Sequence, residues 1–291
     1  TWVQIPDLEG RMVSVLSADP RQPARFYAIA NGAIFQSLDR GKTWAAVDGS
    51  PGGAMVRSLA IAPQDTLALY AGTMGGVYKS AGRGRAWTRV TVPFEVKALA
   101  MASLPPYTLY ASTTGLRDAW IYASEDEGRT WSLSAPLPSR RGGMEGPIPP
   151  EAVSLVVDPR HSQVLYMATK WDGIYRSEDG GTTWSFFDTD LPPFRGEVPT
   201  YDRYSRIPYL FLPPAPPPVL YAATEWGLYR IDLPVVPGSS EEGRDSTETT
   251  EDRWSSTGPS ATLYGGFNLG IAGSTLAVDP QDPSLLYAGA S

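Results

Sequence analysis

Two short segments carry the residue types that sugar chemistry uses. Lys170, Trp171 and Asp172 stand together, and Glu225 and Trp226 form a similar group further along the chain. Two carboxylic groups can act as the acid and the base or nucleophile at a glycosidic bond, and indole rings offer large apolar faces. Asp172 and Glu225 are therefore the candidate catalytic pair, and all five residues are candidates for ligand binding. The plain alternative is that they occupy exposed loop tips without a chemical role.

Several other kinds of catalytic chemistry are excluded. The chain has one histidine, His161, and no cysteine, so a thiolate nucleophile and a histidine–cysteine metal site are unavailable. A Ser-His-Asp triad would need His161, which we predict in a turn away from the candidate residues. No glycine-rich phosphate loop leads into a helix. We expect neither a metal ion nor a cofactor.

The elements that position these residues repeat along the chain. The unit between 153 and 184 holds three apolar runs and closes on a polar turn at 177–184. Similar units begin near 13, 56, 96, 209 and 275. The runs are short and separated by turn residues, so each unit is predicted to form four β-strands, A to D. Four strands in roughly 40 to 55 residues are typical of one β-propeller blade.

The closing turn has the pattern Ser-x-Asp-x-Gly-x-Thr-Trp. It is intact at 37–44, 124–131 and 177–184, and a degenerate copy at 80–87 has Gly82 in place of the aspartate. An aspartate can accept hydrogen bonds from its own turn, the glycine permits positive φ, and the tryptophan buries apolar area. Because the units reuse this turn at one position, we predict a structural role for its residues. They are Asp39, Trp44, Asp126, Trp131, Asp179 and Trp184.

This turn resembles the Asp-box, or bacterial neuraminidase (BNR) repeat. Together with the Leu-Ala-x-Asp-Pro and Leu-Tyr-Ala runs, it makes most of the chain similar to four families: sialidases, xyloglucanase-type glycoside hydrolases, sortilin-like receptors and photosystem II assembly-factor propellers. The resemblance implies an all-β fold, a β-propeller of four-stranded antiparallel blades. These families differ in activity, so the resemblance assigns a fold and leaves the function open.

We expect one β-propeller domain over residues 1–291, with six or seven blades. The last unit stops after its second strand, so we expect it to be incomplete and to be closed by the N-terminal strand at 1–5. The missing third strand favours a natural protein longer than this chain. Insertions are predicted at 136–150, 191–206 and 237–253, the last one acidic and typical of a solvated loop.

A propeller brings the B–C and D–A connections to one face, because successive strands alternate in direction. We predict ligand binding on this face. Besides the two groups above, the B–C and D–A connections contribute Arg117, Asp118, Tyr201, Arg203 and Arg206. Arg206, Ile207 and Pro208 resemble the Arg-Ile-Pro motif of sialidases, whose arginine pairs with the substrate carboxylate. That motif lies in an early blade in sialidases, whereas here it precedes the fifth unit.

Composition and charge restrict the classes of partner that the chain can bind. The net charge of −7 opposes binding to nucleic acid, and no apolar run is long enough to span a membrane. We predict a non-catalytic binding or scaffolding propeller outside the cytoplasm that recognises a protein or a polysaccharide, or that serves a larger assembly as an accessory subunit. The alternative is a glycoside hydrolase, xyloglucanase-like or sialidase-like, that uses Asp172 and Glu225.

Overall fold

A computed structural model describes the greater part of the chain. The described residues are 5–49, 51–65, 67–90, 95–114, 119–133, 142–143, 146–147, 150–169, 172–187, 209–213, 218–224, 227–233, 255–256, 275–278 and 286–289. Among them, the regular structure consists of β-strands and two short 3-10 helices, η1 (Pro6–Leu8) and η2 (Pro51–Gly53).

The described residues form five antiparallel sheets of four strands each, which follow one another along the chain. Blade 1 contains β1 (Val13–Ala18), β2 (Phe26–Ala30), β3 (Ala33–Ser37) and β4 (Ala45–Ala46). Blade 2 contains β5 (Val56–Ile61), β6 (Leu69–Thr73), β7 (Gly76–Ser80) and β8 (Thr88–Val90). Blade 3 contains β9 (Glu95–Met101), β10 (Leu109–Thr114), β11 (Ala119–Ser124) and β12 (Ser132–Leu133).

The remaining strands continue this order. Blade 4 contains β15 (Ala152–Asp158), β16 (His161–Thr169), β17 (Ile174–Ser177) and β18 (Ser185–Phe187). Blade 5 contains β19 (Tyr209–Phe211), β20 (Val219–Thr224), β21 (Gly227–Asp232) and β22 (Ser255–Ser256). Two pairs complete the set: the hairpin β13 (Gly142–Gly143) and β14 (Gly146–Pro147), and the sheet β23 (Thr275–Val278) and β24 (Leu286–Gly289).

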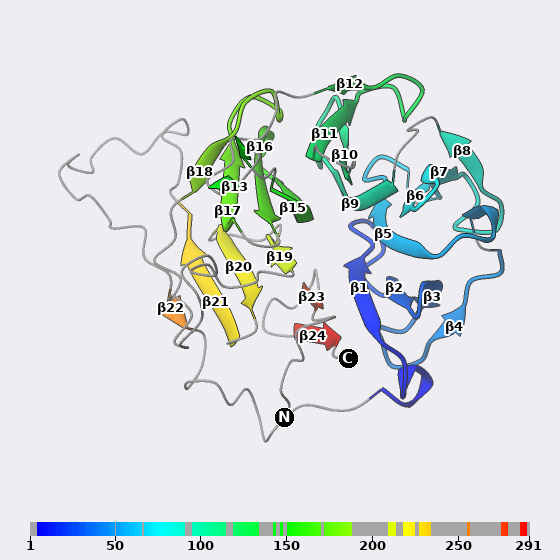
Figure 1. Cartoon of the computed structure of the whole chain (residues 1–291). Helices are drawn as coiled ribbons and strands as arrows, with labels where there is room; N and C mark the ends of the chain where they lie inside the picture. The colour runs from blue at the N-terminus through cyan, green and yellow to red at the C-terminus, as the bar shows by residue number, and fades with distance from the viewer. Residues whose placement is uncertain are drawn as a thin grey trace, which may run out of the picture.

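The sheets form a closed ring. Figure 1 shows them side by side in chain order, with the first strand of each sheet towards the centre and the fourth towards the rim. First strands of neighbouring sheets are in contact all the way round: β1, β5, β9, β15, β19 and β23, which returns to β1. This radial arrangement of four-stranded sheets is a β-propeller.

The apolar core lies between neighbouring sheets. The second strands carry large side chains that are almost completely buried, among them Tyr27, Tyr70, Tyr110 and Tyr166. Tyr110 of blade 3 belongs to the same buried cluster as Leu155 and Leu165 of blade 4. Strands covered on both sides read as nearly continuous apolar runs, which is why the Leu-Tyr-Ala pattern marks them in the sequence.

The turn at 37–44 joins β3 to β4, and hydrogen bonds between its own residues hold it together. Ser37 Oγ donates to Asp39 Oδ1 at 2.8 Å and accepts from the Gly41 N–H at 2.8 Å. Asp39 also accepts from Thr43, from its N–H at 2.9 Å and its hydroxyl at 2.6 Å. The Trp44 indole N–H donates to the Gly41 carbonyl at 2.9 Å. Asp39 therefore ties both ends of the turn together.

The turns at 124–131 and 177–184 repeat this set of bonds. Their fifth residue is a glycine with positive φ, +88° at Gly128. A Cβ on Gly128 would lie 3.0 Å from Val90 Cγ2 of the preceding blade. The glycine thus permits both the turn and the close contact between blades.

Blade 2 has a weaker version of the turn. Ser80 Oγ still accepts from the N–H groups of Gly82 at 3.2 Å and Gly84 at 2.9 Å. The aspartate and threonine positions hold Gly82 and Ala86, so their three bonds are missing. Within the described part of the chain, the buried Trp87 Nε1 has no hydrogen-bond partner.

The ring closes where β23 and β24 pack against blade 1. Thr275 Oγ1 accepts from the Leu16 N–H at 3.0 Å, and the Tyr287 hydroxyl donates to the Arg40 carbonyl at 2.9 Å. The rings of Phe26 and Tyr287 have centroids 4.8 Å apart. The expectation of six or seven blades is wrong for the described residues, which form five four-stranded blades. The last unit, expected to be incomplete, contributes the two strands β23 and β24.

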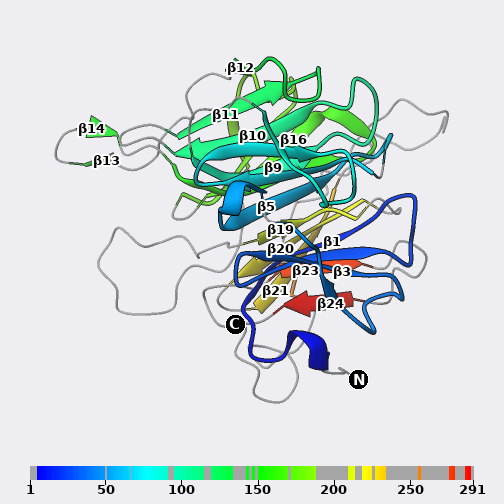
Figure 2. The ribbon, with the colours of Figure 1, turned by 90° about the vertical axis from the view of Figure 1, so that its right-hand side faces the viewer.

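Most of the other segments that were expected from the sequence lie outside the described residues. The predicted N-terminal closing strand falls mainly on 1–4, which lie outside them, and Ile5 is not in a strand. Insertions 191–206 and 237–253 also lie outside. Of 136–150, the structure describes β13, β14 and Pro150, and Figure 2 shows this hairpin projecting from the side of the ring.

Candidate binding face

One face of the ring carries both the starts of the first strands and the turns between second and third strands. Val13 pairs with Ala30 in blade 1, and Val56 pairs with Thr73 in blade 2, so these ends lie together. The Val56 N–H also donates to the Gly32 carbonyl of blade 1 at 3.0 Å, which joins the two blades at this level. We call this the strand-start face. It is the face on which the sequence predicts ligand binding.

Most of the predicted binding residues lie outside the described part of the chain. They are Arg117, Asp118, Lys170, Trp171, Tyr201, Arg203, Arg206, Glu225 and Trp226. Their roles stay predictions. Asp172 is described, and it lies at the strand-start face in the turn between β16 and β17.

Asp172 is buried, with 1% of its surface exposed. Its N–H donates to Thr169 Oγ1 at 2.9 Å, and its Oδ2 accepts from the Tyr175 hydroxyl at 3.1 Å. Thr169 Oγ1 in turn donates to the Gly173 carbonyl at 2.9 Å. These bonds join Asp172 to the two strands of its own blade, so the carboxylate is part of the turn and not of an exposed loop tip.

A row of four charged side chains crosses the strand-start face from blade 2 to blade 4. Arg57 Nη2 on β5 lies 3.2 Å from Glu95 Oε1 on β9. Lys97 Nζ lies 3.0 Å from the same oxygen and 3.6 Å from Oε1 of Glu151, which precedes β15. Their side chains are between 21% and 35% exposed. We call these four residues the charged ladder.

Strand geometry explains why the ladder forms. Glu95 and Lys97 flank the buried Val96 at the start of β9, and the register with β10 shifts at Lys97. Arg57 likewise follows the buried Val56. Sequence reasoning missed these residues because each is a single charge in an apolar strand; the available signal was the alternation at 95–97. Partly exposed ion pairs of this kind contribute about 1 kcal/mol or less to stability. The ladder therefore adds little to the stability of the fold.

The aspartates of the Ser-Asp-Gly-Thr-Trp turns lie on the opposite face. Hydrogen bonds from the side chain and N–H of Thr43 lower the pKa of Asp39 to about 2. The equivalent bonds from Thr130 lower the pKa of Asp126 to about 2. Burial opposes the shift at Asp179, but its pKa is also lowered. These carboxylates already accept bonds from their own turns, which supports a structural role.

The tryptophans of the same turns pack against the ring. Trp44 and Trp184 are each 8% exposed, and Trp131 is partly buried against the cluster between blades 2 and 3. Their indole N–H groups donate within the turn. Trp44 and Trp184 therefore present no open ring face to a ligand.

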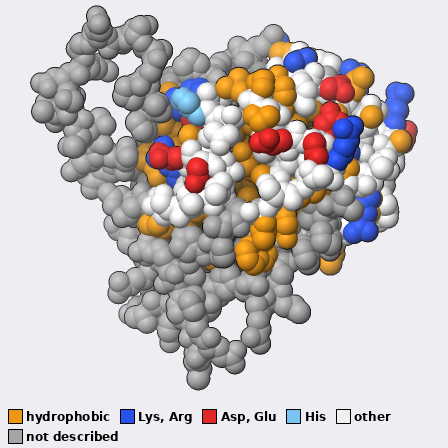
Figure 3. Space-filling model, turned by 90° about the horizontal axis from the view of Figure 1, so that it is seen from above, with side chains coloured by type: hydrophobic (Ala, Val, Ile, Leu, Met, Phe, Trp, Pro, Cys, Tyr) orange, Lys and Arg blue, Asp and Glu red, His pale blue; other side chains and the backbone are white. Residues whose placement is uncertain are grey.

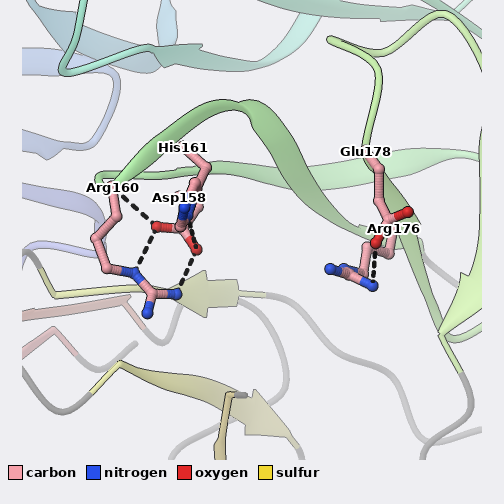
Figure 4. Close-up of polar contacts among 5 residues, drawn as sticks. All are labelled: Asp158, Arg160, His161, Arg176 and Glu178. Atoms are coloured by element: carbon pink, nitrogen blue, oxygen red, sulfur yellow. Dashed lines mark hydrogen bonds and ion pairs between the residues drawn. The ribbon is translucent and has the colours of Figure 1, made fainter. Parts of the chain in front are cut away.

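The single histidine also lies away from the strand-start face. Figure 4 shows Asp158, at the end of β15, bound to Arg160 through Nε at 2.9 Å and Nη2 at 2.6 Å. His161 Nδ1 lies 3.8 Å from Asp158 Oδ2. Burial raises the pKa of Asp158, but the bonds from Arg160 outweigh it and lower the pKa overall. Arg160 is thus the main partner of this carboxylate.

The surface mixes charges of both signs with apolar groups. Figure 3 shows acidic, basic and apolar side chains intermixed over the described part of one side of the ring. Among the described residues, no group of three or more His, Asp and Glu is placed to hold a metal ion. In that same part of the chain, no helix has the length and apolar character needed to cross a membrane.

No protein-family model matches the chain. A xyloglucanase from Paenibacillus sp is 37% identical over 98 residues, which cover 31% of this chain. The matched region is 9% of that enzyme, so the chain spans only a small part of it. The activity of the enzyme is therefore not carried over with the match.

Solved structures show the fold. A GH74 enzyme from Niastella koreensis superimposes with a TM-score of 0.62 at 18% identity, over 95% of this chain and 40% of that one. A chain of the nidogen–laminin complex gives a TM-score of 0.50 at 16% identity, over 72% of this chain and 73% of that one. At such identities the likeness establishes a β-propeller and nothing finer.

Proposed function

We propose that this chain is a non-catalytic recognition propeller that binds its ligand on the strand-start face. The charged ladder carries the proposal. Arg57, Glu95, Lys97 and Glu151 come from three blades and hold one another in fixed positions at the surface. Charged donors and acceptors that are already positioned make strong hydrogen bonds to polar ligand groups with little ordering cost.

The contacts of the carboxylates favour recognition over hydrolysis. A glycosidase of the usual kind needs one carboxyl group that donates a proton and a second that acts as base or nucleophile. Glu95 and Glu151 both form ion pairs with Lys97, and Asp172 accepts a hydrogen bond from Tyr175 inside its turn. In these positions all three are already engaged by partners within the propeller.

A glycoside hydrolase that uses Asp172 and Glu225 is the second candidate. The xyloglucanase similarity favours it, and it also favours a polysaccharide ligand. The propeller found in the nidogen–laminin complex favours a protein ligand instead. Both readings suit a place outside the cytoplasm, alone or as an accessory subunit of a larger assembly, and this location stays part of the proposal.

The first experiment measures hydrolysis and binding on one panel: xyloglucan, other β-glucans and sialosides. We expect no release of reducing ends or sialic acid. The proposal is overturned if a sugar is hydrolysed and Asp172→Asn or Glu225→Gln abolishes the turnover, because the chain is then a glycosidase.

A second experiment tests the face itself. Lys97→Met removes the central cation of the ladder and keeps the length of the side chain. We expect it to weaken binding of whichever probe binds, from the panel or from the peptides described below, at least tenfold, about 1.4 kcal/mol. Lys79→Met is the matched control, because Lys79 pairs with Glu127 at 2.7 Å away from this face and has similar exposure. Equal effects of the two changes would place the binding site elsewhere.

A further inference from the structure

Three of the exposed large apolar side chains in the described part of the chain are methionines on the strand-start face. Met12, Met55 and Met74 are 45%, 60% and 62% exposed. Met12 and Met55 directly precede β1 and β5, and Met74 follows β6. Apolar groups kept at the surface in one place often mark a protein interaction site.

The three methionines form one patch across blades 1 and 2. Met55 and Met74 flank the paired residues Val56 and Thr73, so they lie at the same end of one strand pair. A Cβ on Gly32 would lie 2.3 Å from Met55 Cγ, which places Met55 directly over the turn between β2 and β3.

Met12 reaches the same turn through its backbone. Its N–H donates to Asn31 Oδ1 at 3.0 Å, and its carbonyl accepts from the Asn31 N–H at 3.0 Å. Asn31 directly precedes Gly32, so this turn connects Met12 to Met55. We call Met12, Met55 and Met74 the methionine patch.

Two arginines flank the patch. Arg11 precedes Met12, and its guanidinium carbon lies 5.0 Å from the centre of the Phe35 ring. Arg57 stands on β5 two residues after Met55, at the first position of the charged ladder. Among the described residues Arg11 makes no ion pair.

Three exposed methionines flanked by two arginines have the composition that is typical of a protein–protein interface. Methionine and arginine are enriched at such interfaces, where apolar anchors are surrounded by polar groups. The flexible thioether side chain of methionine adapts to apolar partners of different shape. A sugar ligand would find neither a flat aromatic face nor a hydrogen-bonding group on these three side chains.

From this geometry we infer that the methionine patch is a docking surface for a segment of a protein partner that combines apolar side chains with carboxylates. The apolar side chains pack on Met12, Met55 and Met74, and the carboxylates pair with Arg11 and with donors of Arg57 other than Nη2, which faces Glu95. The inference rests on the proposed function, since it names the partner class for the same face.

Three labelled octapeptides test it: leucine alternating with glutamate, leucine alternating with lysine, and serine alternating with glutamate. Fluorescence anisotropy with the whole chain should show binding of the first peptide at least tenfold tighter than that of the other two. Changing all three patch residues, Met12→Gln, Met55→Gln and Met74→Gln, should abolish this preference. Leu67→Gln with Leu104→Gln is the control, because these leucines are 44% and 42% exposed at the opposite face.

The outcomes separate the inference from the proposed function. Equal binding of all three peptides, or binding that survives the methionine changes, overturns the docking surface. Self-association in sedimentation that the methionine changes abolish would overturn it in favour of a contact between copies of the chain. If a polysaccharide binds through Lys97 and no peptide binds, the inference fails and the recognition function stands. Hydrolysis lost with Asp172→Asn refutes the recognition function itself.

Discussion

At the scale of single residues, hydrogen-bond partners decide what each aspartate does. Asp39 lies at the surface, where Ser37 and Thr43 occupy both of its oxygens. Asp172 is buried and bonded to Tyr175. The same residue type therefore closes a turn in one place and anchors a strand connection in another, and neither role is visible from the residue type alone.

The lowered pKa values predict loss of stability in acid. Asp39 and Asp126 have a pKa of about 2 in the folded chain, against an ordinary value of 3.8. Because the folded-state pKa is the lower one, the ionised groups favour folding above the ordinary value, and this contribution disappears as pH falls towards 2. Thermal unfolding by circular dichroism should show Tm falling over this interval, and falling less in the double variant Asp39→Asn, Asp126→Asn. Identical pH profiles would contradict the assignment.

At the scale of elements, the turn between third and fourth strands is the unit that repeats. Its bonds are the same in blades 1, 3 and 4, and blade 2 keeps only those to Ser80. Since the turn also packs on the preceding blade, as Gly128 does on Val90, it links two sheets as well as two strands. We therefore expect that restoring the missing turn bonds of blade 2 increases the stability of the chain.

Restoring the missing residues of blade 2 should stabilise the chain. Gly82→Asp with Ala86→Thr recreates the aspartate–threonine bonds found at Asp39 and Thr43. There is room, because a Cβ on Gly82 has no neighbour closer than 3.8 Å. We expect a gain of about 1 kcal/mol in the free energy of unfolding, measured by urea denaturation. Each single change should give less, and a destabilised double variant would show that the turn in blade 2 has a different geometry.

At the scale of the whole molecule, the closure between β23 and β1 joins residues from the two ends of the chain. The Leu16 N–H reaches Thr275 Oγ1 at 3.0 Å. The same bond occurs inside the ring, from the Leu210 N–H to Ser154 Oγ at 3.0 Å. The same kind of link thus joins blades 4 and 5 and, at β1, closes the ring.

Breaking the closing link should open the ring locally. Thr275 is completely buried, so Thr275→Val leaves the Leu16 N–H without its acceptor and costs about 1 to 3 kcal/mol. Hydrogen exchange should accelerate in β1, β23 and β24. Ser154→Ala removes the equivalent bond between blades 4 and 5 and should accelerate exchange there instead. Uniform acceleration in both variants would show that the ring opens as one unit and has no separate closure.

Much of the fold could be predicted from the sequence because blades are built from local patterns. The apolar runs and turn residues place the first strands within one residue of where the structure has them, for example Val13, Val56 and Tyr209. Hydrogen bonds such as those of Asp39 also join residues of a single eight-residue turn. Local spacing, however, does not specify how many blades complete a ring, and the described residues form five four-stranded sheets where six or seven blades were expected.

The sequence by itself determined the all-β repeat, the antiparallel strands and the face that receives the B–C and D–A connections, because strand alternation and turn chemistry depend on neighbouring residues. Only the tertiary structure decided which charges meet. Arg57 and Glu151 lie in different blades from Glu95. Arg57 pairs with Glu95 directly and Lys97 joins Glu95 to Glu151, so these contacts depend on how the sheets pack around the ring. The burial of Asp172 and the gathering of the methionine patch have the same cause, since distances between blades are set by packing and not by spacing along the chain.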